Sequence, residues 1–356
     1  MSTGNSAAGL GRNPTHQGGK PRGTSRVRLI GFAESPPPGV TLPDMSYAAM
    51  DLGSSSFHLL VAAPDPRGGL VKLSSYREVL ALGRHLDAEG RLPAAVIGRA
   101  LDALGTMVAL SRSFRAHPIA VGTSALRNAR NRAELVQRAA DSLDLRVEIL
   151  SGSEEAELVY RGARSALSGL PERTAVLDLG GGSLEIAVGE QDACLYTASL
   201  PLGFLRVPSK EPRAVRAHVL ASARAVVKRV RALAPEAWVL SGGTARALAT
   251  LAGPAYRVEG RPLFRTGLET LAHELAASRP ARLEELGVKP ERVETIATGA
   301  LVLAAAVDAL RAPWVHLSRG GLREGVVLRE MERRRRALDG RLGRRAAAYS
   351  AGMALR

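Results

Sequence analysis

The segment Val176–Gly189, which reads VLDLGGGSLEIAVG, decides the fold of this 356-residue chain. An apolar run ends at Asp178, three glycines and Ser183 follow, and a second apolar run resumes around Glu185. We expect a β-hairpin here, because two strand-like runs flank a glycine turn. Glycine has no side chain, so a ligand can approach the backbone of this turn closely. Converging backbone N–H groups in such a turn bind phosphate oxygens. The segment therefore predicts a phosphate-binding hairpin with a carboxylate on each side of its turn.

A related segment occurs earlier in the chain. Residues 49–62 read AMDLGSSSFHLLVA, and they align with the first segment at a constant offset of 127, Asp51 with Asp178 and Ser56 with Ser183. In addition, AVGTSALR at residues 120–127 is loosely echoed by LSGGTARAL at residues 240–248. A repeat of this length is the size of a domain, so we predict two related α/β domains. Two such hairpins facing each other across a cleft would hold a phosphate chain.

The limits of these domains follow from composition. We predict a disordered basic, Pro-rich tail at residues 1–45, a first domain at 46–170, a second domain at 171–330 and a basic C-terminal tail at 331–356. The proline run SPPPGVTLP cannot continue a helix or a central strand. Met45 is an alternative start of the chain. The C-terminal tail is either a polyanion-binding segment or a solvated helix end, and we favour the second.

The bulk composition restricts the class of partner. The formal charge is +15, which attracts polyanions, whereas aromatic residues make up only 4% and do not favour base stacking with nucleic acid. A single cysteine excludes a disulfide framework and a thiolate zinc site. The most apolar run, residues 297–315, contains Asp308 and Arg311, so we predict a buried helix there. We expect a cytoplasmic protein without a membrane or a specific nucleic-acid partner, and a homodimer is one expected assembly.

Acidic residues near the glycine turn suggest a metal. Asp178 and Glu185 are hard oxygen ligands of the type that Mg²⁺ prefers. A second acidic motif, SGSEEAE at residues 151–157, begins with a capping-box pattern. Glu154 and Glu155 point about 100° apart on a helix, so one of them can face a cleft and orient water. Spacing alone does not choose between them. His58 receives no catalytic role.

Six motifs then identify a family. MDLGSSSFHLLVA, VGTSALRNARN, ILSGSEEAELVYRGA, LDLGGGSLEIAVG, LSGGTARAL and GLREGVVL follow one another between about Tyr47 and Glu330. In this order they resemble the exopolyphosphatase / guanosine pentaphosphate phosphohydrolase family. The resemblance implies an α/β fold of two ribonuclease-H-like domains around a central cleft, as in the actin-like ATPase superfamily. It also implies the short two-domain form, which lacks a C-terminal helical domain.

The resemblance assigns roles to individual residues. It makes Glu155 the catalytic glutamate and Arg127 a catalytic arginine that can bind phosphate, and it makes Asp178 and Glu185 ligands of Mg²⁺ or another divalent ion. The implied reaction is hydrolytic removal of a terminal phosphate from inorganic polyphosphate, or of the 5′-phosphate from guanosine pentaphosphate. The implied phosphate-binding residues are Gly53, Ser54, Ser55, Ser56, Thr123, Ser124, Gly180, Gly181, Gly182, Ser183, Gly242, Gly243 and Thr244.

Three positions depart from the common family pattern. Ser55 replaces an asparagine, Leu184 a threonine and Arg319 an acid, and these changes bear on substrate preference.

Two other functions compete with phosphate hydrolysis. One alternative is an ATP-using kinase or ATPase of the same superfamily, which the SEEAE segment and the later motifs disfavour. The other alternative is a non-enzymatic binder of polyphosphate or alarmone, which the complete set of proposed catalytic residues disfavours.

Overall fold

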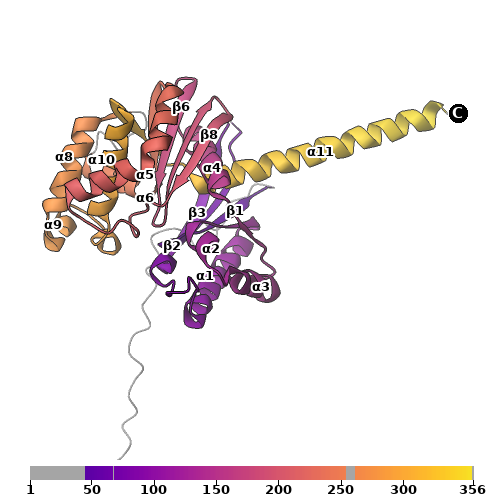
Figure 1. Ribbon diagram of the computed structural model, residues 1–356. Coiled ribbons are helices and arrows are strands. Elements are labelled where there is room, and N and C mark those ends of the chain that lie inside the picture. The colour runs from indigo at the N-terminus through magenta and orange to yellow at the C-terminus, as the bar shows by residue number, and fades with distance from the viewer. Residues whose placement is uncertain (1–44, 67, 254–260, 355–356) are drawn as a thin grey trace, which may run out of the picture.

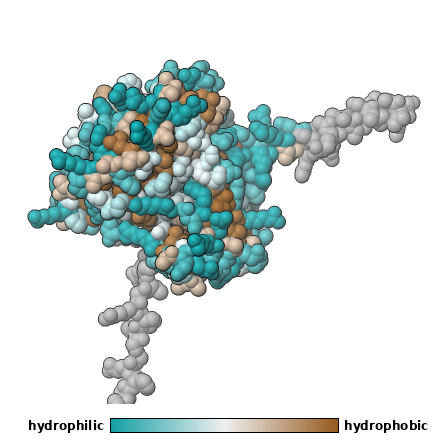
Figure 2. All heavy atoms as spheres, viewed as in Figure 1, coloured by the Kyte–Doolittle hydropathy of each residue, from teal (hydrophilic) through white to brown (hydrophobic). Residues whose placement is uncertain are grey.

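The computed structural model describes residues 45–66, 68–253 and 261–354, with side-chain surroundings up to residue 339. The predicted tail at residues 1–45 lies outside this part of the chain except for Met45. Figure 1 shows two α/β halves side by side and a long C-terminal helix that projects from the body. Figure 2 shows hydrophilic residues over most of the described surface on this face, with hydrophobic residues in scattered patches.

The first half is built on a five-stranded sheet with the order β3-β2-β1-β4-β5. Strands β1, β2 and β3 form an antiparallel meander, while β4 and β5 run parallel to β1. The buried faces of these strands read as apolar runs, as expected for a sheet covered by helices. The strands are β1 (Tyr47–Leu52), β2 (Ser56–Pro64), β3 (Leu70–Val79), β4 (His117–Gly122) and β5 (Val147–Ile149).

The second half repeats this arrangement. Its six-stranded sheet has the order β10-β11-β9-β6-β7-β8, again with an antiparallel meander, β6 to β8, followed by the parallel strands β9 and β11. The short edge strand β10 pairs antiparallel with β11. Asp51 pairs with His58 in the first sheet, and Asp178 pairs with Glu185 at the same register in the second. The predicted α/β fold of two ribonuclease-H-like domains is therefore confirmed. The strands are β6 (Arg173–Leu179), β7 (Leu184–Glu190), β8 (Ala193–Leu200), β9 (Ala237–Ser241), β10 (Leu263–Phe264) and β11 (Trp314–Leu317).

Helices cover both sheets. In the first half they are η1 (Leu82–Arg84), α1 (Ala94–Ser113), α2 (Ser124–Asn128), α3 (Arg132–Leu143) and α4 (Gly152–Ser165). In the second half they are α5 (Pro212–Ala232), α6 (Gly242–Leu251), α8 (Arg265–Ala277), α9 (Pro280–Glu285), η2 (Pro290–Arg292), α10 (Ile296–Leu310) and α11 (Leu322–Ala354).

Two apolar helices belong to the cores. Helix α10 is buried along almost its whole length, which confirms the helix predicted within residues 297–315. Within the described residues, α1 alone is long and apolar enough by composition to cross a membrane. However, Ile97, Leu104 and Met107 of α1 are fully buried in the core of the first half. Core packing therefore accounts for the apolar character of α1.

Helices α4 and α11 cross between the two sheets. Both contribute to a third core cluster, in which Tyr160 of α4 and Val326 of α11 pack between β1 and β6. The crossing is very close, because a Cβ atom on Gly162 would lie 1.9 Å from the carbonyl oxygen of Gly321. Helix α11 also continues through the expected boundary at residues 330 and 331 without a break.

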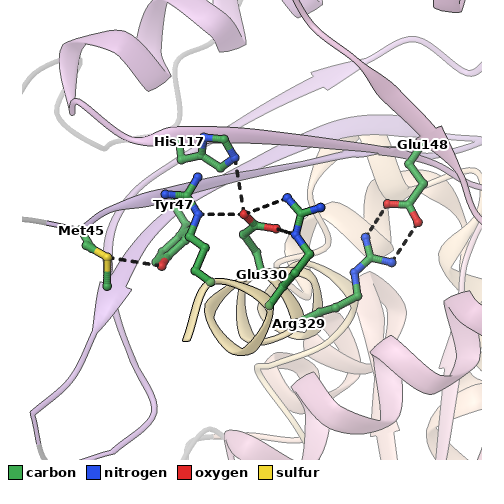
Figure 3. Close-up of polar contacts among 8 residues, drawn as sticks. Met45, Tyr47, His117, Glu148, Arg329 and Glu330 are labelled. Carbon is green, nitrogen blue, oxygen red and sulfur yellow. Dashed lines mark hydrogen bonds and ion pairs between the residues drawn. The ribbon is translucent and has the colours of Figure 1, made fainter. Parts of the chain in front are cut away.

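Polar contacts join α11 to strands β4 and β5 of the first sheet (Figure 3). Glu330 accepts from Arg334 at 2.8 Å and lies 3.6 Å from Nε2 of His117 at the start of β4. The preceding residue of the same helix, Arg329, contacts both carboxylate oxygens of Glu148 on β5, at 3.0 and 2.5 Å. These contacts hold the first turns of α11, which reach the cleft between the domains.

Candidate active site

A cleft of about 120 Å³ lies between the two halves. It is formed by the segments that follow β1, β4, β6 and β9, together with the first turns of α4 and α11. Most residues proposed from the sequence line this cleft, namely Gly53, Ser54, Ser55, Ser56, Thr123, Ser124, Glu155, Asp178, Gly180, Gly181, Gly182, Ser183, Glu185, Gly242 and Gly243. Arg127 and Thr244 are not among the lining residues.

The two hairpin turns have the same backbone closure. The N–H of Gly53 donates to the carbonyl oxygen of Ser56 at 3.2 Å, and the N–H of Gly180 donates to that of Ser183 at 3.0 Å. Ser56 and Ser183 are both buried at the cleft. The sequence repeat thus produces two equivalent loops, each carrying N–H groups and hydroxyls that can donate to phosphate oxygens.

The second loop needs glycine for close packing. A Cβ atom on Gly182 would lie 2.4 Å from Oγ of Ser54 and 2.5 Å from Oγ of Ser124. Real Cβ atoms do not approach other atoms so closely, so a side chain here would push the loops apart. By contrast, a Cβ on Gly180 would meet nothing closer than 3.6 Å. Gly182 therefore allows the loops of the two domains to pack closely together. From the sequence alone, the glycines are expected only to expose backbone N–H groups to phosphate.

The two neighbouring glutamates have different surroundings. The predicted capping box is present: Oγ of Ser151 accepts from the N–H of Glu154 at 3.2 Å, and Oε2 of Glu154 accepts from the N–H of Ser151 at 2.7 Å. Glu155 is instead buried, with 6% of its surface exposed, at the wall of the cleft. The geometry therefore leaves Glu154 to cap the helix and turns Glu155 toward the cleft.

Arg127 contacts Glu155. Nη1 of Arg127 donates to Oε2 of Glu155 at 2.8 Å and to the carbonyl oxygen of Leu150 at 2.9 Å. The arginine lies behind the glutamate, where it can fix the carboxylate orientation. Burial raises the pKa of Glu155 to about 7, with Asp178 adding to the shift, and Arg127 opposes it.

Carboxylates from both domains lie near Glu155. Burial raises the pKa of Asp51 to about 7, with contributions from Glu155 and Asp178. It also raises the pKa of Asp178 to about 6, and that of Glu185 well above its usual value, the latter shift increased by Glu155. Asp51 was not proposed as a site residue, although its alignment with Asp178 in the repeat was a usable signal.

These carboxylates fit a divalent cation. Oδ1 of Asp51 and Oδ1 of Asp178 are buried and have no hydrogen-bond partner within the described chain. Oε1 of Glu185 accepts from Ser199 at 2.8 Å. No three His, Cys, Asp or Glu side chains in the described part could enclose a metal by themselves. Mg²⁺ typically takes only a few carboxylates and completes its shell with water and substrate phosphates, so the donor set suits it.

Cations dominate the other side of the cleft. Arg77, Arg246, Arg292 and Arg323 line it, and none of them was proposed from the sequence. Arg246 and Arg323 lie within two of the quoted motifs, whereas Arg77 and Arg292 lie outside all of them. His58 is also a lining residue, and burial together with nearby arginines holds its pKa well below its usual value.

A second cavity of about 350 Å³ adjoins the cleft, and we call it the cationic cavity. Its charged lining residues within the described chain are all cations: Lys72, Arg77, Arg246, Lys289, Arg292 and Arg323. Burial, together with repulsion from Arg77 and Arg246, lowers the pKa of Arg292 to about 10. Such a cluster of desolvated cations is stabilised when an anion binds among them.

The three departures from the family pattern fall in different places. Ser55 lines the cleft. Leu184 is fully buried in the core of the second half, so its side chain turns away from the cleft. Arg319 lines a third cavity, of about 570 Å³, that shares Arg246 and Arg323 with the cleft. Of the three, Ser55 is therefore the one placed to touch a ligand in the cleft.

Comparisons with known proteins agree with this architecture. A family model described as the Ppx/GppA phosphatase family matches residues 60–334. A guanosine-5′-triphosphate,3′-diphosphate pyrophosphatase of Aeromonas salmonicida is 32% identical over 79% of this chain and 58% of its own length. Exopolyphosphatase 1 of Mycobacterium leprae is 30% identical over 81% of this chain and 90% of its own length.

Solved structures share the fold. An exopolyphosphatase from Cytophaga hutchinsonii superposes with a TM-score of 0.73 at 22% identity, covering 81% of this chain and 98% of that one. A Ppx/GppA family member from Aquifex aeolicus gives a TM-score of 0.70 at 24% identity, covering 82% and 98%. The chain thus spans nearly the whole of these structures but less than two thirds of the Aeromonas protein.

Proposed function

The chain belongs to the Ppx/GppA phosphatase family, and on that premise we propose that it hydrolyses the terminal phosphoanhydride bond of a polyanion. The substrates that we propose are inorganic polyphosphate and, with the same machinery, guanosine pentaphosphate. The relatives' names support both. The observation that carries the proposal is the carboxylate of Glu155, held by Arg127 at the wall of a cleft that both glycine–serine loops line.

The loops would bind the terminal phosphate. Ser54, Ser56 and Ser183 bring hydroxyls to the cleft, and the Gly180–Ser183 turn brings backbone N–H groups. Phosphoryl transfer requires mainly positioning and charge neutralisation, which such donors provide. The phosphates behind the terminal one would then extend toward Arg77 and the cationic cavity.

Glu155 would act on the attacking water. The water oxygen forms a bond to the terminal phosphorus while the bridging P–O bond breaks. The shortened chain leaves as an oxyanion, orthophosphate is released, and the water proton passes to Glu155. Arg127 keeps the carboxylate oriented and partly opposes the effect of burial on its pKa, so that the deprotonated form is available near neutral pH.

We propose that two of the three carboxylates Asp51, Asp178 and Glu185 bind a divalent cation, with Mg²⁺ as the first candidate, and that water and substrate phosphates complete its shell. When bound, such an ion would neutralise charge on the phosphates and on the buried carboxylates. The unpartnered oxygens of Asp51 and Asp178 support this assignment.

Phosphate release tests the proposal. Polyphosphates of several lengths, guanosine pentaphosphate and ATP would each be incubated with the full chain, with and without Mg²⁺. We expect Mg²⁺-dependent orthophosphate release from the first two. Consumption of ATP alone would favour a kinase or ATPase instead, and tight binding without release from any of them would favour a non-enzymatic binder.

A further inference from the structure

An ion pair joins the two domains at the cleft. Nη1 of Arg77, on β3, lies 2.9 Å from Oε1 of Glu291, in η2 of the second half. Both side chains are largely shielded, with 17% and 28% of their surface exposed. The same guanidinium donates to Oγ of Ser56 from Nε at 3.2 Å and from Nη2 at 3.1 Å. Arg77 therefore bridges the first phosphate loop and a carboxylate of the other domain.

The position of Arg77 is set by strand pairing. Asp51 pairs with His58, and His58 pairs with Arg77, on three neighbouring strands. Residues directly opposite each other on adjacent strands project from the same face of the sheet. Arg77 lines both the cleft and the cationic cavity. It thus lies where a phosphate chain would pass from the carboxylates into the cationic cavity.

Glu291 occupies a position suited to a substrate oxygen. Its carboxylate accepts from Arg77 as a phosphate oxygen would, since arginine binds both groups with the same planar set of donors. Glu291 also lines the cleft, next in sequence to Arg292 of the cationic cavity. A carboxylate and a phosphate cannot share this donor without repulsion. A bound phosphate chain must therefore displace the Glu291 carboxylate to reach Arg77.

We propose that Glu291 is an internal competitor of the substrate, and that it sets the affinity of the cleft for linear phosphate chains. In the free protein it neutralises Arg77, and on binding a phosphate takes its place. The bonds to Ser56 keep the guanidinium in position during the exchange. This inference rests on the proposed function, because it assigns the displacing ligand to the substrate.

A second ion pair provides a matched control. Nη1 of Arg84 lies 3.1 Å from Oε2 of Glu294, and this pair also joins the two halves. It is more exposed, at 51% and 73%, and neither residue lines the cleft or the cationic cavity. If Glu291 acts only by tying the domains together, removal of Glu294 should have a similar effect. If Glu291 competes with substrate, it should not.

The experiment compares Glu291→Gln with Glu294→Gln in the full chain. KM and kcat for tripolyphosphate are measured with Mg²⁺, and tripolyphosphate binding is measured separately by calorimetry. We expect KM and Kd to be about fivefold lower in Glu291→Gln, which corresponds to about 1 kcal/mol, with kcat nearly unchanged. Glu294→Gln should stay close to wild type.

Several results would overturn the inference. Unchanged or weaker binding by Glu291→Gln would mean that the carboxylate does not compete, and an equal gain in both variants would point to general loosening of the domains. Failure of every protein to bind tripolyphosphate would reject the proposed ligand. Absence of phosphate release by wild type would count against the proposed function alone, because the calorimetric comparison still decides whether Glu291 competes.

Discussion

Nη1 of Arg127 lies 2.8 Å from Oε2 of Glu155 and 2.9 Å from the carbonyl oxygen of Leu150. Leu150 immediately precedes the cap of α4, the helix that carries Glu155. One guanidinium nitrogen thus fixes the carboxylate relative to the start of its own helix. We infer that Arg127 positions Glu155, a role that does not require Arg127 itself to line the cleft.

This arrangement predicts the behaviour of two arginine variants. Arg127→Gln should lower kcat about 10- to 100-fold with little change in KM, because a misplaced base loses its alignment with water. Arg127 also opposes the burial-raised pKa of Glu155, so its loss should move the acidic limb of the kcat–pH profile to higher pH. Arg127→Lys, which keeps the charge, should restore the position of that limb. An unchanged limb in Arg127→Gln would contradict this account.

The glycines of the second loop provide a test of loop packing. Gly182→Ala should raise KM and lower the melting temperature, because its Cβ would lie 2.4 Å from Oγ of Ser54. Overpacking of this kind costs about 1–3 kcal/mol. Gly180→Ala is the matched control, since its nearest neighbour would be 3.6 Å away. Equal effects of the two substitutions on KM and on thermal unfolding would argue against a contact between the loops.

The buried carboxylates predict a pH-dependent metal effect. In the metal-free protein, burial raises the folded-state pKa of Asp51 to about 7, above its usual value near 4. The fold therefore favours the protonated form, and stability is lost as pH rises between these two values. Asp51→Asn should melt at a higher temperature than wild type at pH 7.5 without metal, and the difference should shrink toward pH 4.

Addition of Mg²⁺ should reverse that order. Wild type should gain thermal stability from the ion, because a ligand that binds only the folded state stabilises it. Asp51→Asn should gain much less. If Mg²⁺ raised both melting temperatures equally, Asp51 would not be part of the cation site.

The repeat made the fold and much of the cleft predictable. Asp51 and His58 are separated by the same number of residues as Asp178 and Glu185. In each sheet the two residues of the pair lie directly opposite each other on neighbouring strands. The glycine and serine residues of both loops meet in one cleft, as expected from that repeat. The family resemblance selected Glu155, which spacing alone could not do.

Other features arise only from tertiary packing. Arg77 and Glu291 are 214 positions apart in the chain, and neither lies in a recognisable motif. The crossing of α4 and α11 depends on glycines such as Gly162, whose role appears only when the opposing backbone is in place. Helix α11 also runs without a break across residues 330 and 331, where composition alone suggests a boundary.

The central claim is that Glu155 is the base, and its neighbour offers a matched control. Glu155→Gln and Glu154→Gln change adjacent residues in the same way. A glutamine at position 154 can still complete the capping box with Ser151. The decisive measurement is kcat for phosphate release from polyphosphate in the two variants. We predict a loss of about 10²- to 10⁴-fold for Glu155→Gln and near wild-type turnover for Glu154→Gln. Full activity of Glu155→Gln would contradict the account.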